Sequence, residues 1–229
     1  MKNQTLKLYG LTLEEINKKL EELNLDKKVV KTYVKEKYLD AFLYVEAKTN
    51  EEEFDQALSK IVNAFVKNLY ADKDVSLYER LYELLTVRKL TVCLMEQGTG
   101  GIITNNLMTF DGAEKIVKAS YVMPSIKAMI DHFDLNPFKL TVNHGVCQEI
   151  AFDIASNIRS KIPADLYIVS LSTLAEGNDL YYNNSKIGFV AIGTAGGVKL
   201  FKVDSDLKKR DFMNQIAKTI CFKLINILK

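Results

Sequence analysis

The sequence is poor in the residues that most often build disulfide frameworks and metal sites. Its 229 residues include three cysteines, three prolines, two histidines and no tryptophan. The cysteines, Cys93, Cys147 and Cys221, form no Cys-x-x-Cys pair, and neither histidine lies at metal-ligand spacing from them. These absences argue against a disulfide scaffold and against a structural zinc site. We therefore expect a protein of a reducing compartment with no metal and no cofactor.

Long apolar runs and an excess of charge of one sign are also missing. No uninterrupted apolar stretch approaches the roughly 18 residues that a membrane span needs, and residues 1–6 lack the apolar core of a signal peptide. Lys and Arg number 31 against 29 Asp and Glu, a net charge of +2 that does not indicate nucleic-acid binding. With 48% hydrophobic and 26% charged residues, the chain is expected to be a globular cytoplasmic protein without membrane contact.

The first part of the chain has the pattern of a small α/β unit. Strands are predicted where β-branched and aromatic residues gather, over residues 4–9, 29–34 and 38–47. Thr12 and Glu15 have the spacing of a capping box, so one helix is predicted to begin after Thr12. A second helix is predicted after Asn50, which precedes three glutamates and an apolar stripe. Residues 1–75 are therefore expected to form a β-α-β-β-α domain.

From residue 76 onward, predicted helices alternate with predicted strands. The apolar runs of buried-strand length cover residues 90–95, 117–123, 165–171 and 188–193. Gly196 and Gly197 are predicted to form a hairpin turn before one more strand, and a final helix carries apolar residues at steps of four. This order predicts a three-layer α/β/α domain over residues 76–229 with a mostly parallel central sheet.

The most informative segment is a glycine-rich turn between a predicted strand and a predicted helix. It consists of Glu96, Gln97, Gly98, Thr99, Gly100 and Gly101. Such a turn places backbone amides at the positive end of a helix dipole, so we expect these residues to bind a small anionic ligand. The glycines are too close together for the dinucleotide fingerprint, and the Lys-Ser/Thr ending of a phosphate-binding loop is missing. The alternative is that they only allow the chain to turn with positive φ.

Other candidate residues give weaker signals. Cys147 opens a predicted helix, where the dipole can lower the pKa of a thiol. Cys93 and Cys221 lie in apolar patterns and are expected to be inert core thiols. We expect His132 and His144 to serve packing or solvent contact. The tyrosines and phenylalanines have core spacings and do not suggest a stacking platform.

The glycine-rich turn also carries a family resemblance. Residues 91–101 read Thr-Val-Cys-Leu-Met-Glu-Gln-Gly-Thr-Gly-Gly. Further motifs follow in order at Gly112-Ala113-Glu114, Gly145-Val146, residues 186–192 and Arg210-Asp211. This series resembles the C-terminal domain of the CinA (competence/damage-inducible) family, the nicotinamide-mononucleotide amidases, whose strand ends in Ala-Glu-Ser-Cys-Thr-Gly-Gly. The N-terminal unit resembles the KH-like domain that precedes the amidase domain in full-length CinA proteins.

The resemblance implies hydrolysis of the carboxamide of a nicotinamide nucleotide by a serine that a lysine assists. This sequence has Gln97 where the family has that serine and Gly98 where the family has cysteine. In the ungapped register Met129 stands at the lysine and Pro124 at an active-site tyrosine. The family's ligand loop, Thr-Gly-Ile-Ala-Gly-Pro, corresponds to Leu-Ser-Thr-Leu-Ala-Glu at residues 171–176. Losing the nucleophile and its base together removes covalent catalysis by several orders of magnitude.

These departures predict a catalytically degenerate CinA-like protein that acts as a binding or assembly module. Its expected partners are a nicotinamide nucleotide or another small anionic ligand and further copies of itself in a homo-oligomer. The alternative is an active amidase or related hydrolase with a rearranged site, in which Lys127, Cys147 or Ser125 has taken over. A third hypothesis, RNA binding through the KH-like unit, requires a GxxG loop between its helices. None occurs before Gly98, which argues against nucleic acid.

Overall fold

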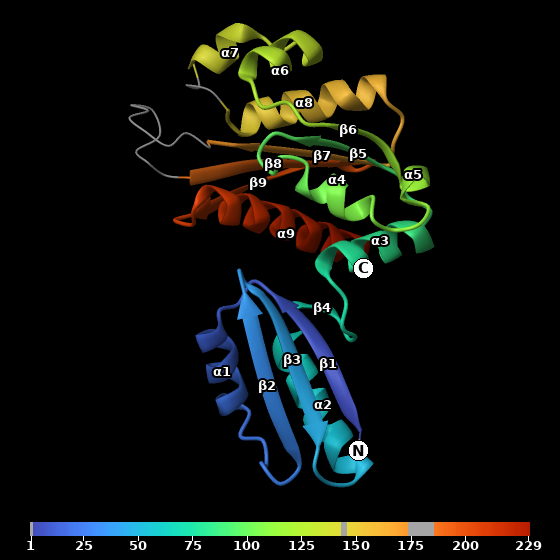
Figure 1. Ribbon diagram of the computed structural model, residues 1–229, viewed down its shortest axis with the longest axis vertical. Coiled ribbons are helices and arrows are strands. Elements are labelled where there is room, and N and C mark those ends of the chain that lie inside the picture. The colour runs from blue at the N-terminus through green and yellow to red at the C-terminus, as the bar shows by residue number, and fades with distance from the viewer. Residues whose placement is uncertain (1, 143–145, 174–185) are drawn as a thin grey trace. The chain divides into compact units, whose positions relative to one another are not determined.

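The computed structural model describes residues 2–142, 146–173 and 186–229 (Figure 1). The chain divides into two compact units. The first comprises Met1–Arg80 and Phe222–Lys229, and the second comprises Leu81–Cys221. Helix α3 (Leu77–Val87) and the long C-terminal helix α9 (Lys209–Leu228) each contribute residues to both units.

The first unit contains an antiparallel sheet with two helices. Its elements are β1 (Asn3–Tyr9), α1 (Leu13–Glu22), β2 (Val30–Lys37), β3 (Asp40–Ala47), α2 (Glu51–Phe65) and β4 (Leu69–Ala71). The strand order is β2-β3-β1-β4. The capping box at Thr12 and Glu15 is confirmed, and the side chain of Asn50 caps α2 by accepting from the Glu53 amide. The predicted β-α-β-β-α order is therefore confirmed, and the short strand β4 is an addition.

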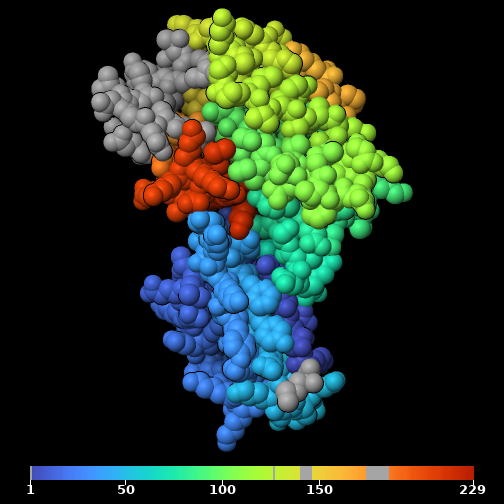
Figure 2. Space-filling view, viewed as in Figure 1, coloured from blue at the N-terminus to red at the C-terminus, as the bar shows by residue number. Residues whose placement is uncertain are grey.

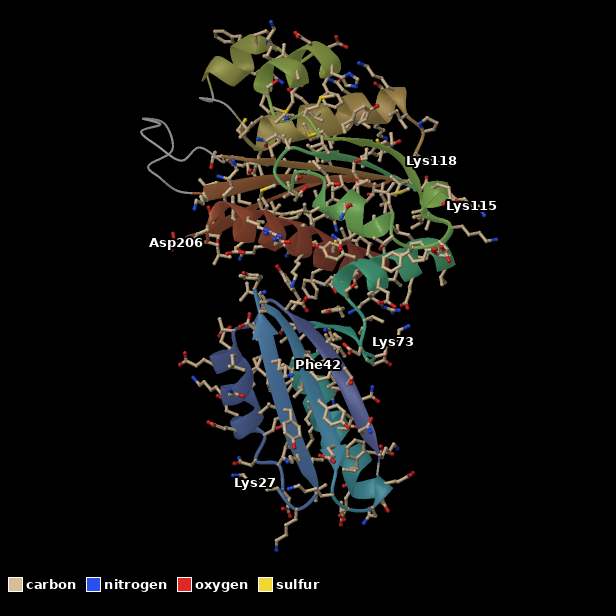
Figure 3. All side chains as sticks on the ribbon, in the orientation of Figure 1. Lys27, Phe42, Lys73, Lys115, Lys118 and Asp206 are labelled. Carbon is tan, nitrogen blue, oxygen red and sulfur yellow. The ribbon has the colours of Figure 1, made fainter. Side chains whose placement is uncertain are left out.

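Alternation along β3 separates the two faces of this sheet. Its buried side chains are Ala41, Leu43, Val45 and Ala47. They pack with Ile16 of α1 and with Phe54 and Ile61 of α2 in one apolar cluster. The intervening side chains, among them Phe42, project from the face that α1 and α2 do not cover (Figure 3).

The second unit alternates helices with strands over most of its length. After α3 its elements are β5 (Val92–Glu96), α4 (Ile102–Leu107), α5 (Ala113–Ile116), β6 (Val117–Tyr121), α6 (Ile126–Phe133), α7 (Pro137–Val142), α8 (Gln148–Lys161), β7 (Leu166–Ser172), β8 (Lys186–Thr194), β9 (Gly197–Ser205) and α9. Helix α8 covers one face of the sheet, with α6 and α7 beyond it, and α4 and α9 cover the other face (Figure 1). The predicted three-layer α/β/α arrangement is therefore confirmed.

The central sheet is mixed, which corrects the expectation of a mostly parallel one. Its strand order is β6-β5-β7-β8-β9. The pairs β5–β6 and β5–β7 are parallel, whereas β7–β8 and β8–β9 are antiparallel. The hairpin predicted at Gly196 and Gly197 is confirmed, and a turn this short permits only antiparallel pairing, because a parallel pair needs a long crossover.

The described residues contain neither a membrane-spanning helix nor a cluster of metal-binding side chains. No helix there is long and apolar enough to cross a membrane. No group of three or more His, Cys, Asp or Glu side chains is placed to hold a metal ion in the same part of the chain.

Candidate functional site

Glu96, at the carboxyl end of β5, has a fully buried carboxylate that binds the start of helix α4. One carboxylate oxygen, Oε2, accepts from the Thr99 hydroxyl at 2.6 Å and from the Ile103 amide at 2.9 Å. The other, Oε1, accepts from the amide of Thr104 at 2.8 Å and from its hydroxyl. The N-terminus of a helix favours a negative charge, and here the protein supplies that charge itself.

Hydroxyl groups extend this arrangement to the neighbouring strands. The Thr99 hydroxyl lies 3.0 Å from the hydroxyl of Ser170 on β7, and the Thr104 hydroxyl lies 2.7 Å from that of Ser120 on β6. We call these five residues, Glu96, Thr99, Thr104, Ser120 and Ser170, the buried carboxylate cluster. The cluster links three adjacent strands to α4, and each buried polar group in it has a partner, as burial requires.

The glycines of the turn serve two different structural needs. Gly100 and Gly101 have φ of +61° and +86°, a conformation that other residues rarely adopt. Gly98 needs space instead, because a Cβ there would lie 2.8 Å from the carbonyl carbon of Leu171 on β7. Its amide donates to the carbonyl of Ser170 at 2.7 Å. The turn therefore packs directly on the backbone of β7.

Amides of the turn and of the start of α4 donate to acceptors within the protein. The Gly98 amide donates to Ser170, the Gly100 amide to the carbonyl of Glu96, and the Ile102 amide to the carbonyl of Thr99. The next two amides along the chain donate to the Glu96 carboxylate. The strand, turn and helix start predicted from the sequence are confirmed. The anion bound at the start of α4 is the side chain of Glu96. That residues 96–101 bind a ligand stays a prediction.

Gln97, which stands where the resemblance places a serine nucleophile, is held by the end of β7. Its Oε1 accepts from the Ser172 amide at 2.7 Å, and its Nε2 donates to the Ser172 carbonyl at 3.3 Å. The carboxamide thus makes with Ser172 the two hydrogen bonds that a neighbouring strand would make. The Ser172 hydroxyl is buried and has no hydrogen-bond partner within the part of the chain that the structure describes.

The position at which the family's lysine is expected lies in the apolar core. Met129 on α6 is fully buried in the apolar cluster that α6 and α8 form with one face of the sheet. Lys127, two residues earlier, is exposed, and Pro124 is exposed as well. The hydroxyl of Ser125 caps α6 by accepting from the Ala128 amide at 3.1 Å. The side chain at the expected lysine position is therefore apolar and away from solvent.

The thiol of Cys147 differs from the sequence expectation. Cys147 precedes α8 and its side chain makes no capping hydrogen bond. Burial raises the pKa of the Cys147 thiol, and the Glu149 carboxylate raises it further, although the amides of Ile150 and Glu149 act in the opposite direction. The expectation that the helix dipole lowers this pKa is therefore wrong, because partial burial outweighs the dipole.

The remaining candidates lie apart from the turn or outside the described residues. Cys93 and Cys221 are fully buried, as expected, and burial raises the pKa of Cys93 to about 11. Cys147 packs with the cluster under α8, whereas Glu96 projects from the opposite face of the sheet. His132 is exposed and its ring contacts Tyr121 and Phe133, as expected of a packing residue. His144, Gly145 and the segment 174–176 lie outside the described residues.

Sequence reasoning missed the hydroxyl residues of the site. Ser170 and Ser172 interrupt the apolar run of β7, in which every residue is buried. The great majority of buried polar groups have a hydrogen-bond partner, so Ser170 gave a signal from which a polar contact such as the one with Thr99 could have been predicted. Nothing in the local sequence indicates that Ser120 and Thr104 meet.

The fold and this site define a three-layer α/β domain with a glycine-rich turn at the carboxyl end of a central parallel strand. The model of the CinA C-terminal domain family matches residues 74–228. The chain therefore belongs to the CinA family through this domain.

Individual relatives agree with this assignment. A CinA-like protein from Prochlorococcus marinus (strain AS9601) is 23% identical over 234 residues, covering 99% of this chain and 55% of the relative. A CinA-like protein from Chloroherpeton thalassium is 30% identical over 132 residues, covering 58% of this chain and 31% of the relative. The chain thus spans about half or less of the length of these relatives. The crystal structure of a competence or damage-inducible protein from Enterobacter asburiae shares the fold at a TM-score of 0.60 and 19% identity, covering 67% of this chain and 96% of that one.

Proposed function

We propose that this chain is a CinA-family protein without the family's serine-based amide hydrolysis, and that it acts as a binding or assembly module. The observation that carries the proposal is the pairing of the Gln97 carboxamide with both backbone groups of Ser172. A carboxamide is not a nucleophile, and this one is engaged in structural hydrogen bonds. Covalent catalysis needs an activated hydroxyl or thiol at the substrate carbonyl.

The surroundings of Gln97 support the same proposal. Met129 is fully buried in the core where the resemblance places an assisting lysine. The helix start that could stabilise a developing oxyanion already holds the Glu96 carboxylate.

As the ligand we propose a nicotinamide nucleotide or another small anionic molecule. It would bind at the surface of the turn, where Gly100 is exposed and Gln97 and Gly101 are half-buried. We further propose that the protein forms a homo-oligomer in the cytoplasm. Calorimetric titration with nicotinamide mononucleotide tests the ligand, and light scattering tests the assembly.

Ammonia release from nicotinamide mononucleotide tests the loss of catalysis. The full chain should release no more ammonia than a heat-inactivated sample, while an active CinA amidase under the same conditions provides the positive control. Turnover that survives purification and falls in a Cys147→Ala or Lys127→Ala variant would establish a rearranged hydrolase site and refute the proposal. The raised pKa of Cys147 and its position on the other face of the sheet from Glu96 are the reasons that we expect no such turnover.

A further inference from the structure

We propose that the open face of the first unit's sheet binds single-stranded nucleic acid, a function separate from that of the glycine-rich turn. Away from its covered end, this face carries the aromatic side chains of Tyr33, Phe42 and Tyr44 on the adjacent strands β2 and β3. In Figure 2 it is the blue surface turned toward the viewer, and in Figure 3 Phe42 marks its position. The other face of the same sheet is buried against α1 and α2.

The three rings form one continuous platform. Tyr33 and Tyr44 are register partners across the β2–β3 ladder, and their ring centroids lie 6.2 Å apart. Phe42 lies two residues before Tyr44 on β3, with its ring parallel to that of Tyr44 at 6.3 Å. Tyr33 is 45% exposed. For these three residues the proposal departs from the expectation that the aromatic residues do not form a stacking platform.

Lysines surround the platform on the same face. The Nζ of Lys31 lies 4.5 Å from the centroid of the Tyr33 ring, and the Nζ of Lys7 lies 5.6 Å from that of Phe42. Lys35 is the register partner of Phe42 and is exposed, as is Lys31. Two carboxylates lie near these lysines: Glu46 is the register partner of Lys31, and Asp74 lies 3.7 Å from the Nζ of Lys7. Three lysines against two carboxylates leave a small excess of positive charge around the rings.

At one end this face is covered by the unit's own C-terminal segment. The ring of Phe222 lies 5.2 Å from that of Tyr9, which is buried. The exposed part of this face contains Lys31, Tyr33 and Lys35 of β2. The platform is therefore placed in the middle of the sheet and at the edge strand β2.

Aromatic rings beside lysines match the chemistry of a single strand better than that of a duplex. Unpaired bases stack on exposed aromatic rings, whereas the bases of a duplex are already stacked on one another. Lysines beside the rings contact the phosphates, which makes affinity depend on salt. This mode needs no GxxG loop, and the absence of that loop was the sequence argument against nucleic acid.

Fluorescence anisotropy with a labelled oligothymidylate of about 12 nucleotides tests the proposal on the full chain. Binding should weaken with salt, with a slope of log K against log salt of about −0.7 for each phosphate contacted. Tyr33→Leu and Tyr44→Leu should each weaken binding about tenfold, because they remove a stacking surface and keep apolar bulk. Tyr33→Phe keeps the ring and should bind like the wild type, which separates stacking from any loss of folding.

A matched pair of charge variants provides the control. Lys31→Ala with Lys35→Ala should flatten the salt dependence, whereas Lys18→Ala with Lys60→Ala removes the same charge from exposed positions on α1 and α2 and should have little effect. The proposal is refuted if neither oligothymidylate nor oligouridylate binds at low salt, or if a duplex of the same length binds equally well. Equal losses for the two lysine pairs, or Leu variants that bind like the wild type, would also refute it.

Discussion

Among single residues, Gln97 and Glu96 have the largest consequences for the chemistry of the glycine-rich turn. Gln97 uses both ends of its carboxamide on Ser172, which is 75 residues away in the sequence. Glu96 uses both carboxylate oxygens on the start of α4. The sequence shows that position 97 is a glutamine. It does not show that the side chain bonds Ser172, because that contact depends on how β5 and β7 align.

The Glu96 carboxylate should contribute strongly to stability. Replacing it in Glu96→Gln places an amide donor among the hydroxyl and amide donors that surround it, so we expect the free energy of unfolding to fall by about 2–4 kcal/mol. Urea unfolding followed by circular dichroism measures the change. Glu114→Gln is the matched control, since Glu114 is exposed in the first turn of α5, and it should change stability by less than about 0.5 kcal/mol. Equal stability of the two variants would contradict the role assigned to Glu96.

The Cys147 thiol should react slowly with alkylating reagents near neutral pH. Its pKa is raised, so at any given pH less of it is the reactive thiolate than for a free cysteine of pKa about 8.5. The rate of carbamidomethylation, followed by peptide mapping, should therefore continue to rise above pH 9. Glu149→Gln removes a group that raises this pKa and should speed the reaction at fixed pH. Rapid modification of the wild type at pH 7 would contradict this prediction.

Among the structural elements, the turn between β5 and α4 shows why its glycines are not equivalent. The alternative interpretation from the sequence, that the glycines allow positive φ, holds for Gly100 and Gly101. Gly98 serves a close approach of two backbones, which only the position of β7 reveals. A cysteine at position 98, as in the family motif, would not fit unless β7 moved.

Adding a single methyl group at position 98 tests this close approach. Gly98→Ala would place a Cβ against the backbone of Leu171, so we expect a loss of about 1–3 kcal/mol in the free energy of unfolding. Gly196→Ala is the control, because the nearest atom to a Cβ there is 3.7 Å away in the side chain of Thr194. Thermal unfolding of the two variants should differ clearly. A Gly98→Ala protein as stable as the wild type would show that the turn and β7 are farther apart.

Local signals explain which elements the sequence predicted. The capping box at Thr12 and Glu15 and the hairpin at Gly196 involve residues close together in the chain, and both were found. Strand β4 has three residues, too few for a periodic pattern. The aromatic platform had a signal, since Phe42 and Tyr44 alternate with buried Leu43. What the sequence could not supply was the pairing of β2 with β3, which brings Tyr33 beside them.

For the whole molecule, the structure describes two units with different surface chemistry. The second unit carries the CinA-type fold and the glycine-rich turn, and the first carries the aromatic and lysine-lined sheet face that we propose for nucleic acid. The resemblance seen in the sequence extends over both units. The family model itself matches only residues 74–228. The two proposals concern different units and can fail independently.

A stoichiometric turnover experiment tests the central claim most directly. The protein is incubated overnight with an equal concentration of nicotinamide mononucleotide, and the acid product is quantified by mass spectrometry after quenching. Because Gln97 offers no nucleophile and its carboxamide is held by Ser172, we predict no more product than in a heat-inactivated sample. Product above the level of the heat-inactivated sample, formed by the wild type and lost in a single-residue variant of the turn, of Cys147 or of Lys127, would contradict the account.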